Sequence, residues 1–169
     1  MGFRPVSSTF TSAPPLLPPR KLAGGKEFDG SYLHAAVARE SDSRYKYDDN
    51  LTKATSRRDG SRSILGHFIC KACNPSRSWY SGNICTELFI ASNDRYRTIL
   101  HAQQCRRCET YIMPEVDEGN YVQKIVSALD LWINRPERKE FPSDYRKTKP
   151  HDKERCHGCQ IGVCIRQRK

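Results

Sequence analysis

The sequence predicts a small α+β fold in which one helix packs on an antiparallel β-sheet. Three observations lead to this prediction: β-prone runs between residues 64 and 102, an amphipathic helical stretch at 120–136, and eight cysteines distributed around them. Only 37% of the 169 residues are hydrophobic, and glycine and proline contribute ten residues each. We therefore expect a small core and a disordered N-terminal flank.

The disordered flank is expected over residues 1–63. Proline and glycine interrupt residues 1–30, and residues 31–62 are polar, with a basic patch at Lys53–Arg62. A short helix at Leu33–Glu40 is the one regular element predicted there, because LHAAVARE contains good helix formers. The folded domain is then residues 64–165, followed by a basic tail at 166–169.

The sheet is predicted from three runs with the composition of short strands: Gly66–Cys70, Asn83–Ile90 and Arg95–Ala102. In the second run the alternation of a strand places Ile84 on one face and Cys85 on the other, where Cys85 is expected to be a small buried hydrophobe. Ser92–Asp94 has the residues of a hairpin turn, so the second and third runs are expected to pair.

The helix is predicted from apolar residues that recur at three- and four-residue spacing in NYVQKIVSALDLWINRP. Asn120 is the expected N-cap, Gln123 stands at the capping-box position, and Pro136 marks the end. The apolar face that packs on the sheet consists of Tyr121, Val122, Ile125, Val126, Leu129, Trp132 and Ile133.

The cysteines indicate bound metal rather than disulfides. The N-terminus lacks the apolar run of a secretory signal, and no stretch approaches the roughly 18 apolar residues of a membrane span. We therefore expect an intracellular protein, in the cytoplasm or nucleus, where thiols stay reduced. The chain has three C-x-x-C pairs but no βαβ pattern, which disfavours thioredoxin-like redox chemistry.

Two zinc ions are predicted, because each C-x-x-C turn aims two sulfurs at one cation and zinc takes four ligands. One set is Cys70, Cys73, Cys105 and Cys108, with the strands at 83–102 forming a hairpin between the two pairs. The other set is His151, Cys156, Cys159 and Cys164, in which Gly158 and Gly162 permit positive φ angles. Both sets are complete, so neither offers the open position of a catalytic zinc, and we expect no enzymatic activity.

Alternatives remain for the second set. His157 could replace His151, although a residue inside the C-x-x-C turn points awkwardly for the same ion. Cys85 could also replace either histidine in the set. His67 and His101 lie in predicted strands near cysteines and are expected to pack or be exposed rather than to bind metal.

The ordered combination of motifs resembles the 3CxxC-type zinc-finger family, over about His67 to Cys164. The residues that carry the resemblance are F-x-C-x-x-C at Phe68–Cys73, W-x-S at Trp79–Ser81, Q-C-x-x-C at Gln104–Cys108, the helix, then His151 and C-x-x-C-x-x-G-x-C at Cys156–Cys164. The family includes receptor-transporting proteins, zygote arrest proteins and fungal proteins, and we expect this chain among the fungal members. The resemblance implies zinc binding and a non-enzymatic role.

The charge distribution favours nucleic acid as the partner. The net charge of +10 lies in the flanks, with +4 over residues 1–66, zero over 67–134 and +6 over 135–169. Basic residues and the tyrosines Tyr80, Tyr96 and Tyr111 suit RNA binding, as the resemblance to zygote arrest proteins also implies. The alternative is a protein-interaction adaptor or a trafficking factor related to the receptor-transporting proteins, with the proline-rich Ala13–Arg20 as a candidate ligand segment.

Overall fold

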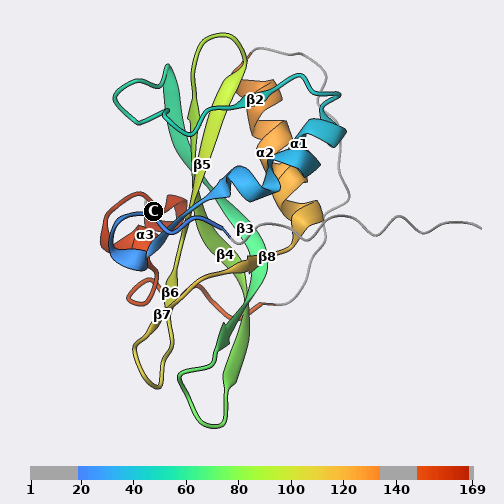
Figure 1. Ribbon diagram of the computed structural model, residues 1–169. Helices are drawn as coiled ribbons and strands as arrows, with labels where there is room; N and C mark the ends of the chain where they lie inside the picture. The colour runs from blue at the N-terminus through green and yellow to red at the C-terminus, as the bar shows by residue number, and fades with distance from the viewer. Residues whose placement is uncertain (1–18, 134–147, 168–169) are drawn as a thin grey trace, which may run out of the picture.

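The computed structural model describes residues 19–133 and 148–167 and confirms the α+β class (Figure 1). The strands are β1 (Glu27–Asp29), β2 (Lys46–Tyr47), β3 (Arg58–Cys70), β4 (Arg77–Ile90), β5 (Arg95–His101), β6 (Gln103–Gln104), β7 (Tyr111–Ile112) and β8 (Glu115–Val116). The helices are α1 (His34–Glu40), α2 (Glu118–Trp132) and α3 (His157–Gln160), with 3₁₀ turns at Ala23–Gly25, Gly30–Leu33 and Ile165–Gln167.

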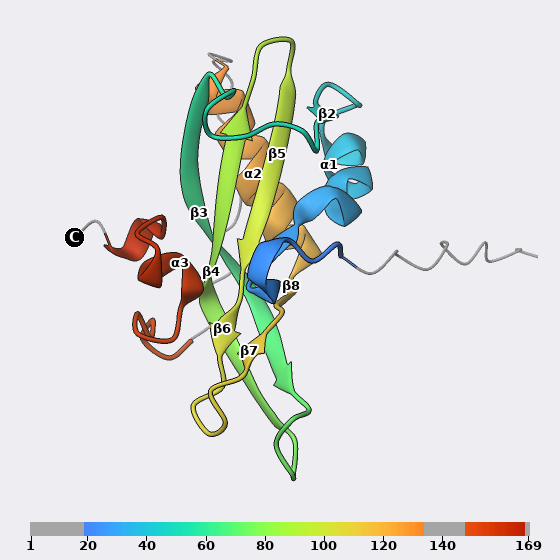
Figure 2. The same ribbon diagram turned by 60° about the vertical axis from the view of Figure 1, so that its left-hand side comes forward.

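In the described part of the chain, six strands form one sheet in the order β1-β5-β4-β3-β8, with β2 also paired to β5. The pairs are antiparallel except β2–β5, and β6 pairs with β7 in a separate ribbon. Helices α1 and α2 lie on one side of the sheet and α3 on the other (Figure 2). The sheet thus separates the helical layer from the C-terminal segment.

The long hairpins extend the predicted strands. Strand β3 pairs with β4 from Arg58 opposite Ile90 to Cys70 opposite Arg77, so both strands continue well beyond the apolar runs visible in the sequence. The predicted β4–β5 turn is confirmed, since Asn93 and Asp94 have φ of 64° and 58°. The three-stranded scaffold of β3, β4 and β5 carries Cys70 at the end of β3, and Cys73 lies in the turn that follows.

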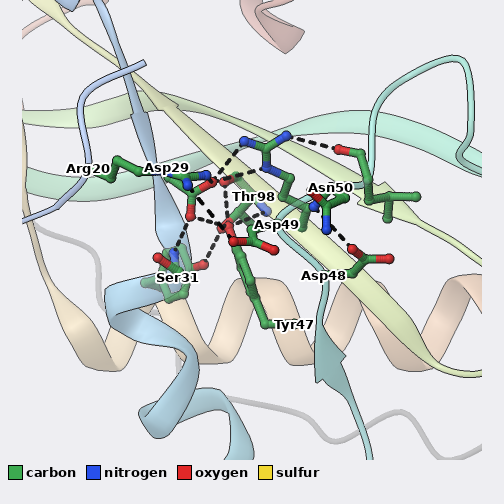
Figure 3. Close-up of polar contacts among 11 residues, drawn as sticks. Arg20, Asp29, Ser31, Tyr47, Asp48, Asp49, Asn50 and Thr98 are labelled. Carbon is green, nitrogen blue, oxygen red and sulfur yellow. Dashed lines mark hydrogen bonds and ion pairs between the residues drawn. The ribbon is translucent and has the colours of Figure 1, made fainter.

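The prediction of disorder is wrong for residues 19–63, and residues 1–18 lie outside the described residues. The segment is ordered because Asp29 is buried in an ion pair with Arg97, whose Nε and Nη2 lie 3.1 and 2.9 Å from one carboxylate oxygen. The other oxygen accepts from the Ser31 amide and the Tyr47 hydroxyl (Figure 3). Burial alone would raise the pKa of Asp29, but these hydrogen bonds outweigh it and lower that pKa.

The core is larger than the composition predicts. Fifteen buried residues form one apolar cluster between the sheet and the helices, and three of them, Leu33, Val37 and Tyr45, come from the segment expected to be disordered. The predicted helix at Leu33–Glu40 is present as α1, which packs on α2. The boundary predicted at residue 64 therefore falls inside β3 and not at the edge of the folded domain.

Helix α2 begins earlier than predicted. Its N-cap is Asp117, whose carboxylate accepts a hydrogen bond from the Asn120 amide at 2.9 Å, and the side chain of Asn120 instead accepts from the Leu65 amide at 2.8 Å. Asn120 as N-cap was therefore wrong, as was the capping-box role of Gln123, while Pro136 lies outside the described residues. None of the described helices has the length and apolar composition required to cross a membrane.

Candidate metal centres

The first centre, formed by Cys70, Cys73, Cys105 and Cys108, lies where β3 ends and the β6–β7 ribbon turns. The four sulfurs lie within 4.8 Å of one another, and three of the cysteines are buried while Cys108 is exposed. The measured separations are 3.9 Å for Cys70–Cys73, 3.5 Å for Cys70–Cys108 and 3.8 Å for Cys73–Cys105. Four sulfurs at about 2.3 Å from a tetrahedral zinc are about 3.8 Å apart, so the set fits zinc.

Within the first centre, burial raises the pKa of Cys70 and raises that of Cys73 to about 12, whereas the turn of residues 105–108 stabilises thiolates. Burial alone would raise the pKa of Cys105, but backbone N–H groups of Cys108 and Arg107 donate to its sulfur and lower that pKa. Hydrogen bonds from Thr110, whose hydroxyl lies 3.2 Å from the Cys108 sulfur, lower the pKa of Cys108 to about 6. Zinc binds the deprotonated thiol, so the lowered pKa values in the C-x-x-C turn of residues 105–108 favour zinc binding.

The second centre, formed by His151, Cys156, Cys159 and Cys164, lies on the face of the sheet opposite α2. Its four ligand atoms are also within 4.8 Å of one another. The His151 Nε2 atom is 3.3 Å from the Cys159 sulfur and 3.8 Å from the Cys164 sulfur. A zinc-bound imidazole nitrogen and sulfur are about 3.6 Å apart in a tetrahedron, so this set fits zinc with Nε2 as the nitrogen ligand.

Cys85 packs against the second centre without belonging to its set of four. It is 1% exposed and clusters with Cys156, Cys159 and Cys164. A Cβ at Gly158 would lie 2.4 Å from the Cys85 sulfur, so Gly158 is needed for close approach and not for positive φ. Gly162 does have a positive φ, of 81°, as expected. The prediction of a buried, hydrophobe-like Cys85 is confirmed.

His157 does not complete the second centre. Its Nδ1 atom lies 3.0 Å from the Nδ1 atom of His101, and both rings are buried. The two histidines form a separate group with Glu27. His151 is therefore the histidine of the second centre. No local pattern indicated that His101 and His157, which are 56 positions apart, would meet.

A surface cleft of about 130 Å³ lies between the two centres. His151 of the second centre lines it, and so does Arg106, which follows Cys105 of the first centre in the sequence. The remaining lining residues are Arg77, Ser78, Trp79, Tyr80, Ser81, Gln103, Gln104, Lys149, Pro150, Asp152 and Arg155. The basic residues of this cleft come from three separate segments, so sequence reasoning did not identify it.

Comparison with known proteins agrees with the donor chemistry. A family model of a 3CxxC zinc ribbon, described as a zinc-binding domain, matches residues 63–162. Neither the comparison with curated proteins nor the comparison with solved structures gave a match. The matched range contains seven of the eight predicted ligands, and the eighth, Cys164, lies two residues beyond its end. The match concerns the domain and does not separate the receptor-transporting, zygote-arrest and fungal branches.

Proposed function

Because the chain belongs to the 3CxxC-type zinc-binding domain family, we propose that it is a non-enzymatic zinc protein that binds single-stranded RNA in the cleft between its metal centres. Each sulfur-rich centre has four protein ligands, which fill a tetrahedron and leave no open position for a reacting water. When bound, the two ions supply structure rather than chemistry.

The charge of the cleft supports an anionic ligand. Four cationic side chains and one carboxylate, Asp152, line it. Asp152 pairs with Arg106 at 3.0 Å and with Arg155 at 3.5 Å, whereas Arg77 and Lys149 form no ion pair with another described residue. Two cations thus face the cleft without an internal partner in the described structure, as phosphate recognition requires.

The observation that carries the proposal is an exposed aromatic ring beside these cations. Tyr80 is 62% exposed, and its ring stacks on His67 with centroids 4.4 Å apart. Since His67 covers one face, the exposure of Tyr80 arises from its other face and its edge. An aromatic ring that packs on a neighbour with one face and is exposed on the other can stack on an unpaired base.

The amide of Gln103 holds the lining of the cleft in place. Its oxygen accepts from the Trp79 indole at 3.1 Å, and its nitrogen donates to the Ser81 hydroxyl at 3.0 Å and to the Asn83 carbonyl at 3.3 Å. The position of Gln103 is therefore fixed before any ligand binds, which lowers the entropy cost of binding.

Other residues that the sequence suggested for RNA binding are buried or engaged in contacts within the protein. Tyr96 is fully buried, and the ring of Tyr111 is covered by the Lys26 amine at 4.5 Å, so neither is available for stacking. In the basic patch, Arg58 and Arg62 both lie over the Trp132 ring. Arg168 and Lys169 lie outside the described residues. The cleft is thus a better site than the flanks.

The test is a titration of the full-length, zinc-loaded chain with a labelled single-stranded RNA across a salt series. Tyr80→Ala should weaken binding roughly 5- to 150-fold through lost stacking. Arg77→Ala should reduce the slope of log K against log salt by about 0.7. Arg39→Ala, an exposed arginine on α1, is the control and should change neither.

Absence of binding at low salt would overturn the RNA proposal, and so would equal effects of Tyr80→Ala and Arg39→Ala. In that case a protein partner for the same cleft becomes the leading interpretation. Crosslinking in cells, followed by identification of the recovered molecule, separates these two outcomes.

A further inference from the structure

We propose that Glu27, His101 and His157 form a third metal site, distinct from the two sulfur-rich centres and suited to a borderline divalent cation such as Zn²⁺. Their three ligand atoms lie within 4.8 Å of one another. His101 is fully buried, His157 is 8% exposed and Glu27 is half-buried. We call this group the His–His–Glu cluster.

The backbone fixes the position of each member. Glu27 in β1 lies directly opposite His101 in β5, and opposed residues of an antiparallel pair project from the same face. The amide of His157 donates to the Ala102 carbonyl at 3.1 Å, which brings the start of α3 beside the end of β5. Backbone pairing alone therefore brings these three segments, which are far apart in the sequence, close together.

The separation of the two imidazoles suits a shared ion. Nitrogens at about 2.0–2.1 Å from one metal are about 2.9 Å apart at a right angle and about 3.4 Å apart in a tetrahedron. The 3.0 Å between the Nδ1 atoms of His101 and His157 falls within this range. A direct hydrogen bond between the rings gives a similar distance, but it assigns no role to Glu27.

Glu87 orients His101 for this task. Its carboxylate accepts from Nε2 of His101 at 2.9 Å, which places the proton on Nε2 and leaves the lone pair of Nδ1 directed at His157. Histidines that bind metals usually donate their other ring N–H to a carboxylate in this way. Glu27 and Glu87 together carry two negative charges, which offset a divalent ion in a largely buried position.

A metal ion bound by the His–His–Glu cluster would link the N-terminal and C-terminal parts of the described structure. The ion would join β1, the short edge strand near the N-terminus, to α3, which carries part of the second centre. Two nitrogens and one oxygen bind more weakly than four sulfur-rich ligands, so this ion should be the first to leave under mild chelation. Three protein ligands also leave a position for water.

The test is a Co²⁺ titration of the metal-free full-length chain, followed by absorption. The first two equivalents should give thiolate-to-cobalt charge transfer from the sulfur-rich centres. A third equivalent should add ligand-field bands with no further charge transfer, because it meets nitrogen and oxygen only. Glu27→Gln should remove the third component and leave the first two unchanged.

The matched control is Glu115→Gln, an exposed carboxylate 4.0 Å from a different histidine, His67, which should keep all three components. His157→Gln should likewise lose only the third component, and a changed charge-transfer band would place His157 in the second centre instead. Saturation of the unaltered protein at two equivalents, or a third component that survives Glu27→Gln, overturns the proposal. Because Glu27 is half-buried, its variant remains informative even where a substitution of buried His101 prevents folding.

Discussion

The two regions that pack on the β3–β4 hairpin are stabilised by different interactions. On one face of the sheet lies the region that we call the apolar half, in which fifteen buried residues pack between the sheet and helices α1 and α2. The other region, which we call the metal end, comprises the Cys70 end of the hairpin and the opposite face of the sheet at Cys85. Its buried clusters consist of cysteines: three in the first centre and four around the second. Only a few partly buried apolar residues, Trp79, Ile112 and Val163, accompany them.

This difference shows that zinc does not replace the apolar core but extends the fold beyond it. The composition suggested a small core, yet the apolar half has a continuous core of fifteen buried residues. The metal end has turns and short ribbons that bury little apolar surface, so their order depends on coordination. We therefore expect the two regions to respond separately to substitution.

The largest expected effect is at the metal end. Cys105→Ser should lose one ion per chain, because structural zinc is linked to about 10–16 kcal/mol of apparent binding free energy. Elemental analysis gives the ion count, and a thermal melt should show an early transition that the unaltered protein lacks. Cys85→Ala is the control, since Cys85 lies outside both sets of four and its loss should leave the ion count unchanged.

The next effect is at the junction of the N-terminal segment and the sheet. Asp29→Ala leaves the buried Arg97 without its carboxylate and should lower the free energy of unfolding by about 3–5 kcal/mol. Chemical denaturation measures this loss, and zinc content should not change. A loss below about 1 kcal/mol would contradict the claim that this ion pair orders residues 19–63.

The pH dependence of the Asp29 contribution follows from its lowered pKa. A carboxyl whose pKa is lower in the folded state stabilises the fold fully above its unfolded pKa of about 3.9. The contribution disappears as pH falls through the folded pKa. The difference in stability between the unaltered protein and Asp29→Ala should therefore be constant from about pH 5 to 7 and shrink below about pH 4.

A smaller effect is expected inside the apolar half. Leu129 is fully buried on α2, and Leu129→Ala should cost about 2–4 kcal/mol through the lost apolar contact and the cavity left behind. The ion count should stay the same, because Leu129 contacts neither centre. Loss of an ion in this variant would show that the two regions unfold as one unit.

The metal sets could be predicted from the sequence because C-x-x-C spacing is a local signal. Two cysteines three positions apart can bind one ion in a single turn, whatever the rest of the fold does. The face of the sheet on which Cys85 lies was also predictable from a local signal. Alternation along a strand places neighbouring residues on opposite faces, so Cys85 and Ile84 lie on different sides of the sheet.

The order of residues 19–63 could not be predicted, because it depends on non-local pairs. Asp29 and Arg97 are 68 positions apart, and the few apolar residues of α1 become core only against α2. The cleft and the His–His–Glu cluster were missed for the same reason, as each is assembled from three segments. The N-cap was misplaced because Asn120 is itself a preferred capping residue, and only the tertiary contact with Leu65 assigns it elsewhere.

The most direct test of the two-region account is hydrogen exchange of the full-length chain before and after zinc removal with a strong chelator. The account predicts that amides of residues 103–112 and 156–164 lose protection, while those of 84–90 and 121–129 keep most of theirs. Loss of protection across all four segments, or unchanged protection in the first two, would contradict it.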